Sequence, residues 1–234
     1  PHEFIIYLAD SKNCPYGEKS PREIYKLTKI MVDFLLKRDI KLLVIACNTI
    51  TVTCIDELRK DYPNLPIVGI VPVVKTAVEK TKSKKIGIFS TSVTANSSYQ
   101  KDLIEKYVKD CSVLNLGSST LVSLIEKLDF KGIDMVLKKE LLPFKDSNID
   151  ILALGCSHFP LIKDQIQKYL PEVLILDSSN AVSRQVQRIL KQNKTLSNST
   201  NPSYNFYTTG DLKALRYFAE KLTNKAKLSR ISLQ

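Results

Sequence analysis

Short, almost wholly apolar segments alternate along this chain with segments of helical periodicity. Segments 86–89 and 151–154 contain only apolar residues and one glycine, which is typical of strands buried on both faces of a parallel sheet. Alternation of such strands with helices predicts an α/β fold with doubly wound, mainly parallel sheets. The expected strands are 4–8, 42–46, 67–70, 86–89, 113–116, 151–154, 174–176 and 206–208.

The clearest helix start is Ser20-Pro21-Arg22-Glu23, a capping box with proline at the first helical position. We expect this helix to run to about residue 37. Further helices are expected at about 51–60, 72–81, 95–109, 119–128, 133–142, 160–169, 179–192 and 211–222.

The glycines of the 234-residue chain exclude two common nucleotide-binding motifs. The 7 glycines lie at positions 17, 69, 87, 117, 132, 155 and 210. No GxGxxG and no GxxxxGK[ST] can be built from these positions, which rules out a dinucleotide fingerprint and a Walker-type phosphate loop. The length fits one large α/β domain or two smaller ones.

Basic residues outnumber acidic ones by 35 to 24, which gives a formal net charge of +11. The excess is concentrated in residues 184–234, where ten Lys and Arg face only two acidic residues. Aromatic residues hardly interleave with these, which argues against nucleic-acid binding and favours a solvated surface. A DNA-associated protein stays an alternative hypothesis. No apolar run approaches the ~18 residues of a membrane span, so no membrane association is expected.

The five cysteines, at positions 14, 47, 54, 111 and 156, include no CxxC pair. The only histidines are His2 and His158. This spacing argues against a zinc site, so we expect no metal and no metal cofactor. An odd number of cysteines without a signal peptide is typical of free thiols in the reducing cytoplasm.

Two predicted strands end in matching polar motifs. One is followed by Cys47-Asn48-Thr49 and the other by Gly155-Cys156-Ser157-His158. Ligands of open α/β sheets bind beyond the carboxyl ends of the strands. We therefore expect two pseudo-symmetric lobes with the active site in the cleft between them. Residues 1–72 plus 178–234 would form the lobe with Cys47, and residues 73–177 the lobe with Cys156.

Thiols at two facing strand ends allow two kinds of chemistry. Cys156 with His158 resembles a nucleophile and its base, but this interpretation leaves Cys47-Asn48-Thr49 without a role. Two opposed thiols instead suit removal of a proton from one face of a carbon and delivery to the other, because a thiol can act as acid or base after modest tuning of its pKa.

Further motifs resemble those of glutamate racemases, which belong to the cofactor-independent aspartate/glutamate racemases. In chain order they are Asp10-Ser11-Lys12-Asn13-Cys14-Pro15-Tyr16-Gly17, Ala46-Cys47-Asn48-Thr49, Ile86-Gly87-Ile88-Phe89-Ser90-Thr91 with Thr94, Leu154-Gly155-Cys156-Ser157-His158-Phe159-Pro160-Leu161, and Thr208-Thr209-Gly210-Asp211. The resemblance covers essentially the whole chain. It implies an isomerase that makes D-glutamate for peptidoglycan, and so serves cell-wall biogenesis and cell shape, usually as a homodimer.

The resemblance also implies roles for individual residues. Cys47 and Cys156 would be the acid/base thiols, His158 would assist Cys156, and Glu126 would be the acidic residue beside them. The residues expected to bind glutamate are Asp10, Pro15, Tyr16, Gly17, Asn48, Thr49, Thr91, Thr94 and Ser157.

The chain departs from the family pattern at its start. The family begins with a strand that ends in Asp-Ser-Gly, and no such motif precedes Pro1 in this sequence. A parallel sheet without this strand would leave a row of backbone groups unpaired, so we expect the gene product to be longer. The alternatives are an aspartate racemase-like enzyme and a catalytically inactive binding protein. His158 stands where the aspartate branch typically has an acid, which argues against the first.

Overall fold

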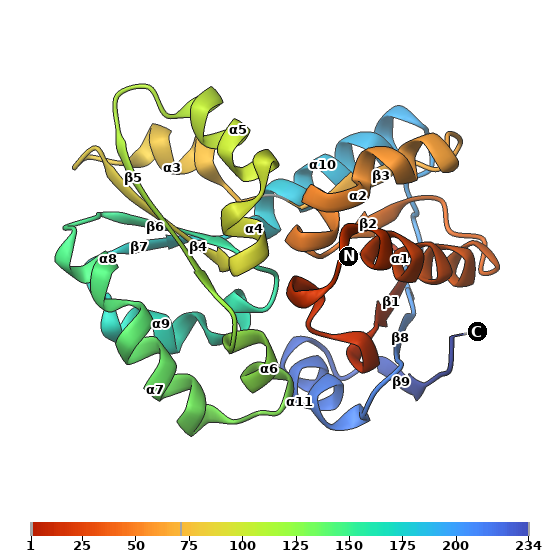
Figure 1. Ribbon diagram of the computed structural model, residues 1–234. Coiled ribbons are helices and arrows are strands. Elements are labelled where there is room, and N and C mark those ends of the chain that lie inside the picture. Colours follow the sequence, from red (N-terminus) through yellow and green to blue (C-terminus); the bar gives the residue numbers. More distant parts are fainter. Residues whose placement is uncertain (1, 71, 234) are drawn as a thin grey trace.

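The computed structural model describes residues 2–70 and 72–233, which form an α/β fold (Figure 1). Every strand pairing among the described residues is parallel, as the sequence predicts. The strands are β1 (Ile5–Ala9), β2 (Leu43–Ile45), β3 (Ile67–Gly69), β4 (Lys85–Thr91), β5 (Ser112–Ser118), β6 (Ile151–Gly155), β7 (Leu174–Leu176), β8 (Tyr204–Thr208) and β9 (Ala226–Arg230).

The largest sheet has the strand order β5-β4-β6-β7 and lies on the left in Figure 1. Its central strands β4 and β6 are buried almost throughout because helices cover both faces. Phe89 packs edge-on against Phe144 on one face, with a ring-centroid distance of 5.6 Å. On the other face Ile86 and Ile88, both fully buried, pack with Val74. This sheet is a core in its own right.

The remaining strands form two smaller sheets, with the orders β1-β8-β9 and β2-β3. β1 and β2 are therefore both edge strands, and apolar side chains on them are solvent-exposed. The exposed fraction is 46% for Ile5 and 42% for Tyr7 on β1, and 36% for Val44 on β2. β1 and β2 therefore belong to separate sheets and do not pair with each other.

Most expected helices lie within a few residues of their predicted positions. Helix α1 begins at Pro21, where the Ser20 hydroxyl accepts a hydrogen bond from the Glu23 N–H, as a capping box requires. The helices are α1 (Pro21–Leu36), α2 (Asn48–Asp61), α3 (Val74–Lys80), α4 (Ser92–Asn96), α5 (Ser98–Tyr107), α6 (Leu121–Glu126), α7 (Phe130–Glu140), α8 (Leu142–Asp146), α9 (Lys163–Tyr169), α10 (Ser179–Gln192) and α11 (Leu212–Leu222). None of the described helices is long and apolar enough for a membrane span.

Two predicted helices are each divided in two, and one strand was not predicted. The single helix expected at 95–109 is two helices, because Ser97 is extended and its hydroxyl caps α5 by accepting from the Gln100 N–H. The helix expected at 133–142 is likewise α7 followed by α8. Strand β9 was not predicted, because its sequence AKLSR offers little apolar signal.

Candidate active site

Cys47 lies between the end of β2 and the start of α2. Its backbone is extended, with φ −140° and ψ 120°, and its side chain is half-buried. Burial raises the pKa of the Cys47 thiol to about 11. The backbone N–H groups of Ile50 and Thr49 oppose this rise, whereas the neighbouring Cys156 adds to it. The Cys47 side chain is therefore a protonated thiol at neutral pH.

Cys156 follows β6 directly and is buried. The helix expected to follow it begins only at Lys163, because a 3-10 turn, Phe159–Ile162, comes first. Cys156 thus differs from Cys47, which stands at the start of an α-helix. The side chain near Cys156 is instead His158, and Cys156 contributes to the raised pKa of that imidazole.

His158 and Glu126 form an ion pair, with a His158 Nε2 to Glu126 Oε1 distance of 2.7 Å. Burial opposes the charge on each, yet the side chains of Cys14, Cys156 and Glu126 raise the pKa of His158 well above its ordinary value. His158, with the Ser11 side chain, lowers the pKa of Glu126. His158 is therefore an imidazolium beside Cys156.

Glu126 is brought to this pair by helix α6. The Ser118 hydroxyl at the end of β5 accepts hydrogen bonds from the N–H groups of Leu121 (3.2 Å) and Thr120 (3.4 Å), which holds the first turn of α6. No role was predicted for Ser118 from the sequence. Its local role is to fix the helix that carries Glu126.

Three threonine hydroxyls link α2 to the end of β4 and to α4. Thr49 Oγ1 lies 3.1 Å from Thr91 Oγ1 and 3.2 Å from Thr94 Oγ1, and Thr91 donates to Thr94 at 3.0 Å. Asn48 beside them is buried, and its Nδ2 has no hydrogen-bond partner among the residues that the structure describes. A buried, unpaired donor is costly, so this position favours a ligand that accepts a hydrogen bond.

The Asp10 carboxylate is held by protein donors. It accepts from Tyr16 Oη (2.6 Å), Thr209 Oγ1 (2.7 Å) and Asn13 Nδ2 (2.8 Å). Tyr16 is thereby fixed in the interior, and burial together with Asp10 raises the pKa of its hydroxyl. Since these donors occupy the carboxylate, the contacts of Asp10 in this structure orient Tyr16.

The remaining residues predicted to bind substrate lie beside these groups. The peptide bond between Cys14 and Pro15 is cis, and Gly17 follows Tyr16 in a 3-10 turn. A Cβ atom on Gly17 would lie 3.6 Å from Thr91 Cβ, so the turn lies against the end of β4. Ser157 is partly buried between Cys156 and His158.

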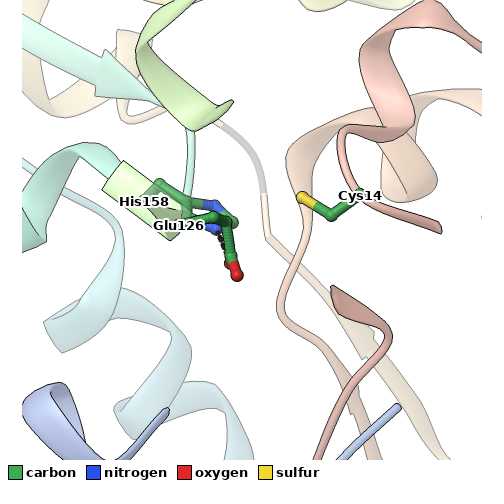
Figure 2. A group of neighbouring side chains, drawn as sticks. All are labelled: Cys14, Glu126 and His158. Carbon is green, nitrogen blue, oxygen red and sulfur yellow. Dashed lines mark hydrogen bonds and ion pairs between the residues drawn. The ribbon is translucent and has the colours of Figure 1, made fainter. Parts of the chain in front are cut away.

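Cys14 lies opposite the His158–Glu126 pair (Figure 2). No role was predicted for Cys14 from the sequence. The Cys14 sulfur, a Glu126 oxygen and a His158 nitrogen all lie within 4.8 Å of one another. The wide spacing of these residues in the chain argued against a metal site, yet the fold brings a thiol, an imidazole and a carboxylate together. Spacing alone could not reveal this cluster.

Comparison with known proteins agrees with the fold. Residues 1–186 match the family model described as Asp/Glu/Hydantoin racemase. The chain therefore belongs to the Asp/Glu/hydantoin racemase family.

The relatives that match most of the chain are glutamate racemases. That of Clostridium acetobutylicum is 42% identical over 192 residues, which cover 81% of this chain and 75% of that protein. The crystal structure of Escherichia coli glutamate racemase in complex with L-glutamate and the activator UDP-MurNAc-ala has a TM-score of 0.87 at 27% identity, and covers 100% of this chain and 90% of that one. That of the Francisella tularensis enzyme in complex with D-glutamate has a TM-score of 0.83 at 32% identity, with coverages of 100% and 89%. The predicted family and fold class are confirmed.

Proposed function

We propose that this chain interconverts L- and D-glutamate by proton transfer between the substrate Cα and two thiols, Cys47 and Cys156. One sulfur, as thiolate, accepts the Cα proton, and the other, as thiol, donates its proton to the opposite face of the carbon. Each turnover thus moves one proton onto one sulfur and one off the other, and no cofactor is needed.

The observation that carries this proposal is the position of the two thiols. They follow the carboxyl ends of β2 and β6, which belong to different sheets, and they are close enough for a charge on Cys156 to raise the pKa of Cys47. A nucleophile paired with a single base would leave Cys47 without a function, whereas two-base transfer uses both.

The polar groups around the thiols suit an amino-acid substrate. We propose that Asn48 and the hydroxyls of Thr49, Thr91 and Thr94 hold one carboxylate, since these groups donate hydrogen bonds where the Asn48 amide has no protein partner. The other proposed contacts, to the second carboxylate and the amine, are Pro15, Tyr16, Gly17 and Ser157, and Asp10 would contribute by holding the Tyr16 hydroxyl in place.

His158 and Glu126 would set the charge of Cys156. An imidazolium near the Cys156 sulfur favours the thiolate that must accept the substrate proton. Glu126 in turn keeps His158 charged through the 2.7 Å ion pair. At Cys47, backbone N–H groups favour the thiolate instead. The pKa values of the two thiols would therefore be lowered by different groups.

The decisive experiment replaces each thiol in the full chain. Cys47→Ala and Cys156→Ala should each lower racemisation in both directions by at least the ~10²–10⁴-fold that acid–base catalysis contributes. The control is Cys111→Ala, because Cys111 is a free thiol with no proposed role. If either variant keeps substantial racemisation, the two-thiol mechanism is wrong.

The same assay defines the substrate. L- and D-aspartate should turn over far more slowly than L- and D-glutamate. Equal rates would favour the aspartate racemase-like alternative, and no turnover of either would favour an inactive binding protein. A steep loss of DNA affinity with rising salt would be needed to support a DNA-associated role.

We also propose several broader features. They are a supply of D-glutamate for peptidoglycan and hence for cell shape, a cytoplasmic location and a homodimer, which light scattering of the purified protein would test. We also propose that residues 1–72 plus 178–234 and residues 73–177 are the two lobes. Strands β4 to β7 lie in the second range and the other strands lie in the first.

A further inference from the structure

We propose that Cys14, His158 and Glu126 form a binding site for a thiophilic divalent cation such as Zn²⁺, and that the bound cation inhibits racemisation. The three residues lie 32 or more positions apart in the chain and come from different parts of the fold. Figure 2 shows Glu126 and His158 on one side and the Cys14 sulfur facing them from the other.

The distances suit a tetrahedral zinc ion. Ligand atoms at the usual Zn–S and Zn–N or Zn–O distances of ~2.3 and ~2.0 Å lie about 3.3–3.8 Å from one another. Here the three donor atoms all lie within 4.8 Å of one another. His158 Nε2 and Glu126 Oε1 lie 2.7 Å apart, so these two atoms would separate to ~3.3 Å as the cation replaces their hydrogen bond.

The donor set selects the kind of cation. Mg²⁺ and Ca²⁺ prefer oxygen ligands throughout, whereas a thiolate and an imidazole favour Zn²⁺ and other soft or borderline metals. A carboxylate as third ligand is compatible with zinc. To bind the cation, Cys14 would lose its thiol proton and His158 the proton that makes it an imidazolium, both to solvent. A fourth position would stay open to water or to a substrate carboxylate.

Inhibition follows from what the cation would occupy. A cation between His158 and Cys14 would replace the ion pair that tunes Cys156 and would lie beside the Cys156 sulfur. This part of the inference rests on the proposed function, whereas metal binding itself does not.

The test uses the purified, metal-free full chain and the variants Cys14→Ala and Cys111→Ala. Co²⁺ is the spectroscopic probe, because a thiolate ligand gives it a charge-transfer absorption band, and Zn²⁺ displaces it in a competition titration. The unaltered chain and Cys111→Ala should bind one ion with this band. Cys14→Ala should lose the band and bind Zn²⁺ at least ~10-fold more weakly, the loss typical of a disturbed metal site.

Racemase activity is then measured with rising Zn²⁺, and each variant is compared with its own metal-free rate. Zn²⁺ should inhibit the Cys111→Ala variant, and EDTA should reverse this inhibition. Inhibition of the Cys14→Ala variant should need at least ~10-fold more Zn²⁺. Equal Zn²⁺ affinity in the two variants would overturn the proposed site. A Cys14-dependent cobalt band without racemase activity would instead sustain the site and contradict the proposed function.

Discussion

The two thiols lie at comparable strand ends, but the sheets behind them differ. Cys156 follows a central strand of a continuous four-stranded sheet, and all five residues of β6 are buried. Cys47 follows β2, an edge strand with only one neighbour, and Val44 in that strand is exposed. Regions with few buried apolar contacts open locally at lower free energy. The part of the molecule around Cys47 should therefore be the more easily opened.

The largest expected effect concerns the reactivity of Cys47. Because burial raises its thiol pKa to about 11, the thiolate fraction below that pH rises about tenfold per pH unit. Alkylation of Cys47 by iodoacetamide should therefore increase ~10³-fold between pH 7 and 10, as peptide mass spectrometry can follow.

Cys54 on α2 is the matched comparison, since burial raises its thiol pKa to about 11 as well. It should show the same slope at a lower absolute rate, because only 3% of its surface is exposed. If the region around Cys47 opened so often that its thiol were hydrated, the Cys47 curve would level off well below pH 10. That result would make the contrast between the two regions larger than the structure implies.

The second effect is on stability. Leu152 in β6 is fully buried, so Leu152→Ala should lower the free energy of unfolding by ~2–5 kcal/mol through lost burial and a cavity. Val44→Ala in β2 should cost under ~1 kcal/mol, as for a largely surface position. Urea unfolding of both variants measures the difference. Equal costs would show that β2 is as firmly packed as β6.

The sequence predicted the parallel α/β fold because buried strands have a distinctive, almost wholly apolar pattern. It could not predict the order of the strands within each sheet, because an edge and a central strand can carry similar apolar residues. Strand β9 was missed for a related reason. Its lysine, serine and arginine give no apolar alternation, and only pairing with β8 identifies it.

The site was predicted unevenly. The paired Cys motifs could be read directly from strand ends, since parallel strands present their carboxyl ends at one edge. The contact of Glu126 with His158 joins residues 32 positions apart, and no local pattern encodes such a distance. The same holds for Cys14, which only the fold brings opposite His158.

The third effect concerns the hydroxyls that join the two regions. Thr94 is fully buried, and its hydroxyl bonds with those of Thr49 and Thr91. Thr94→Val should leave these groups short of a partner at a cost of ~1–3 kcal/mol. If the threonine hydroxyls bind substrate, Thr94→Val should raise KM for glutamate about tenfold, which corresponds to ~1.4 kcal/mol. The change in kcat should be smaller.

Thr120→Val is the control, because Thr120 is exposed and its side chain does not cap α6. It should leave KM and stability close to those of the unaltered chain. Should the two variants raise KM equally, the threonine hydroxyls do not bind substrate.

The smallest expected effect concerns contacts at the amino end of the four-stranded sheet. Asp150 precedes β6, and its carboxylate accepts hydrogen bonds from Thr81 Oγ1 (2.5 Å) and from the N–H groups of Lys82 (2.6 Å) and Ser83 (2.9 Å). Although partial burial opposes it, these donors lower the pKa of Asp150 from 3.8 to about 2. The loop that leads into β4 is thereby fixed to the start of β6.

A carboxylate whose pKa is lower in the folded state stabilises the protein above its unfolded pKa, and this contribution is lost as the pH falls through the folded pKa. The window here runs from about pH 4 down to pH 2. After allowance for solvent screening, Asp150→Asn should lower the free energy of unfolding by ~1 kcal/mol at pH 7. Asp150→Asn should also weaken the dependence of the free energy of unfolding on pH within that window. Asp146→Asn, at the exposed end of α8, should change neither quantity. Identical acid profiles for the two variants would mean that the Asp150 contacts do not secure the sheet that carries Cys156.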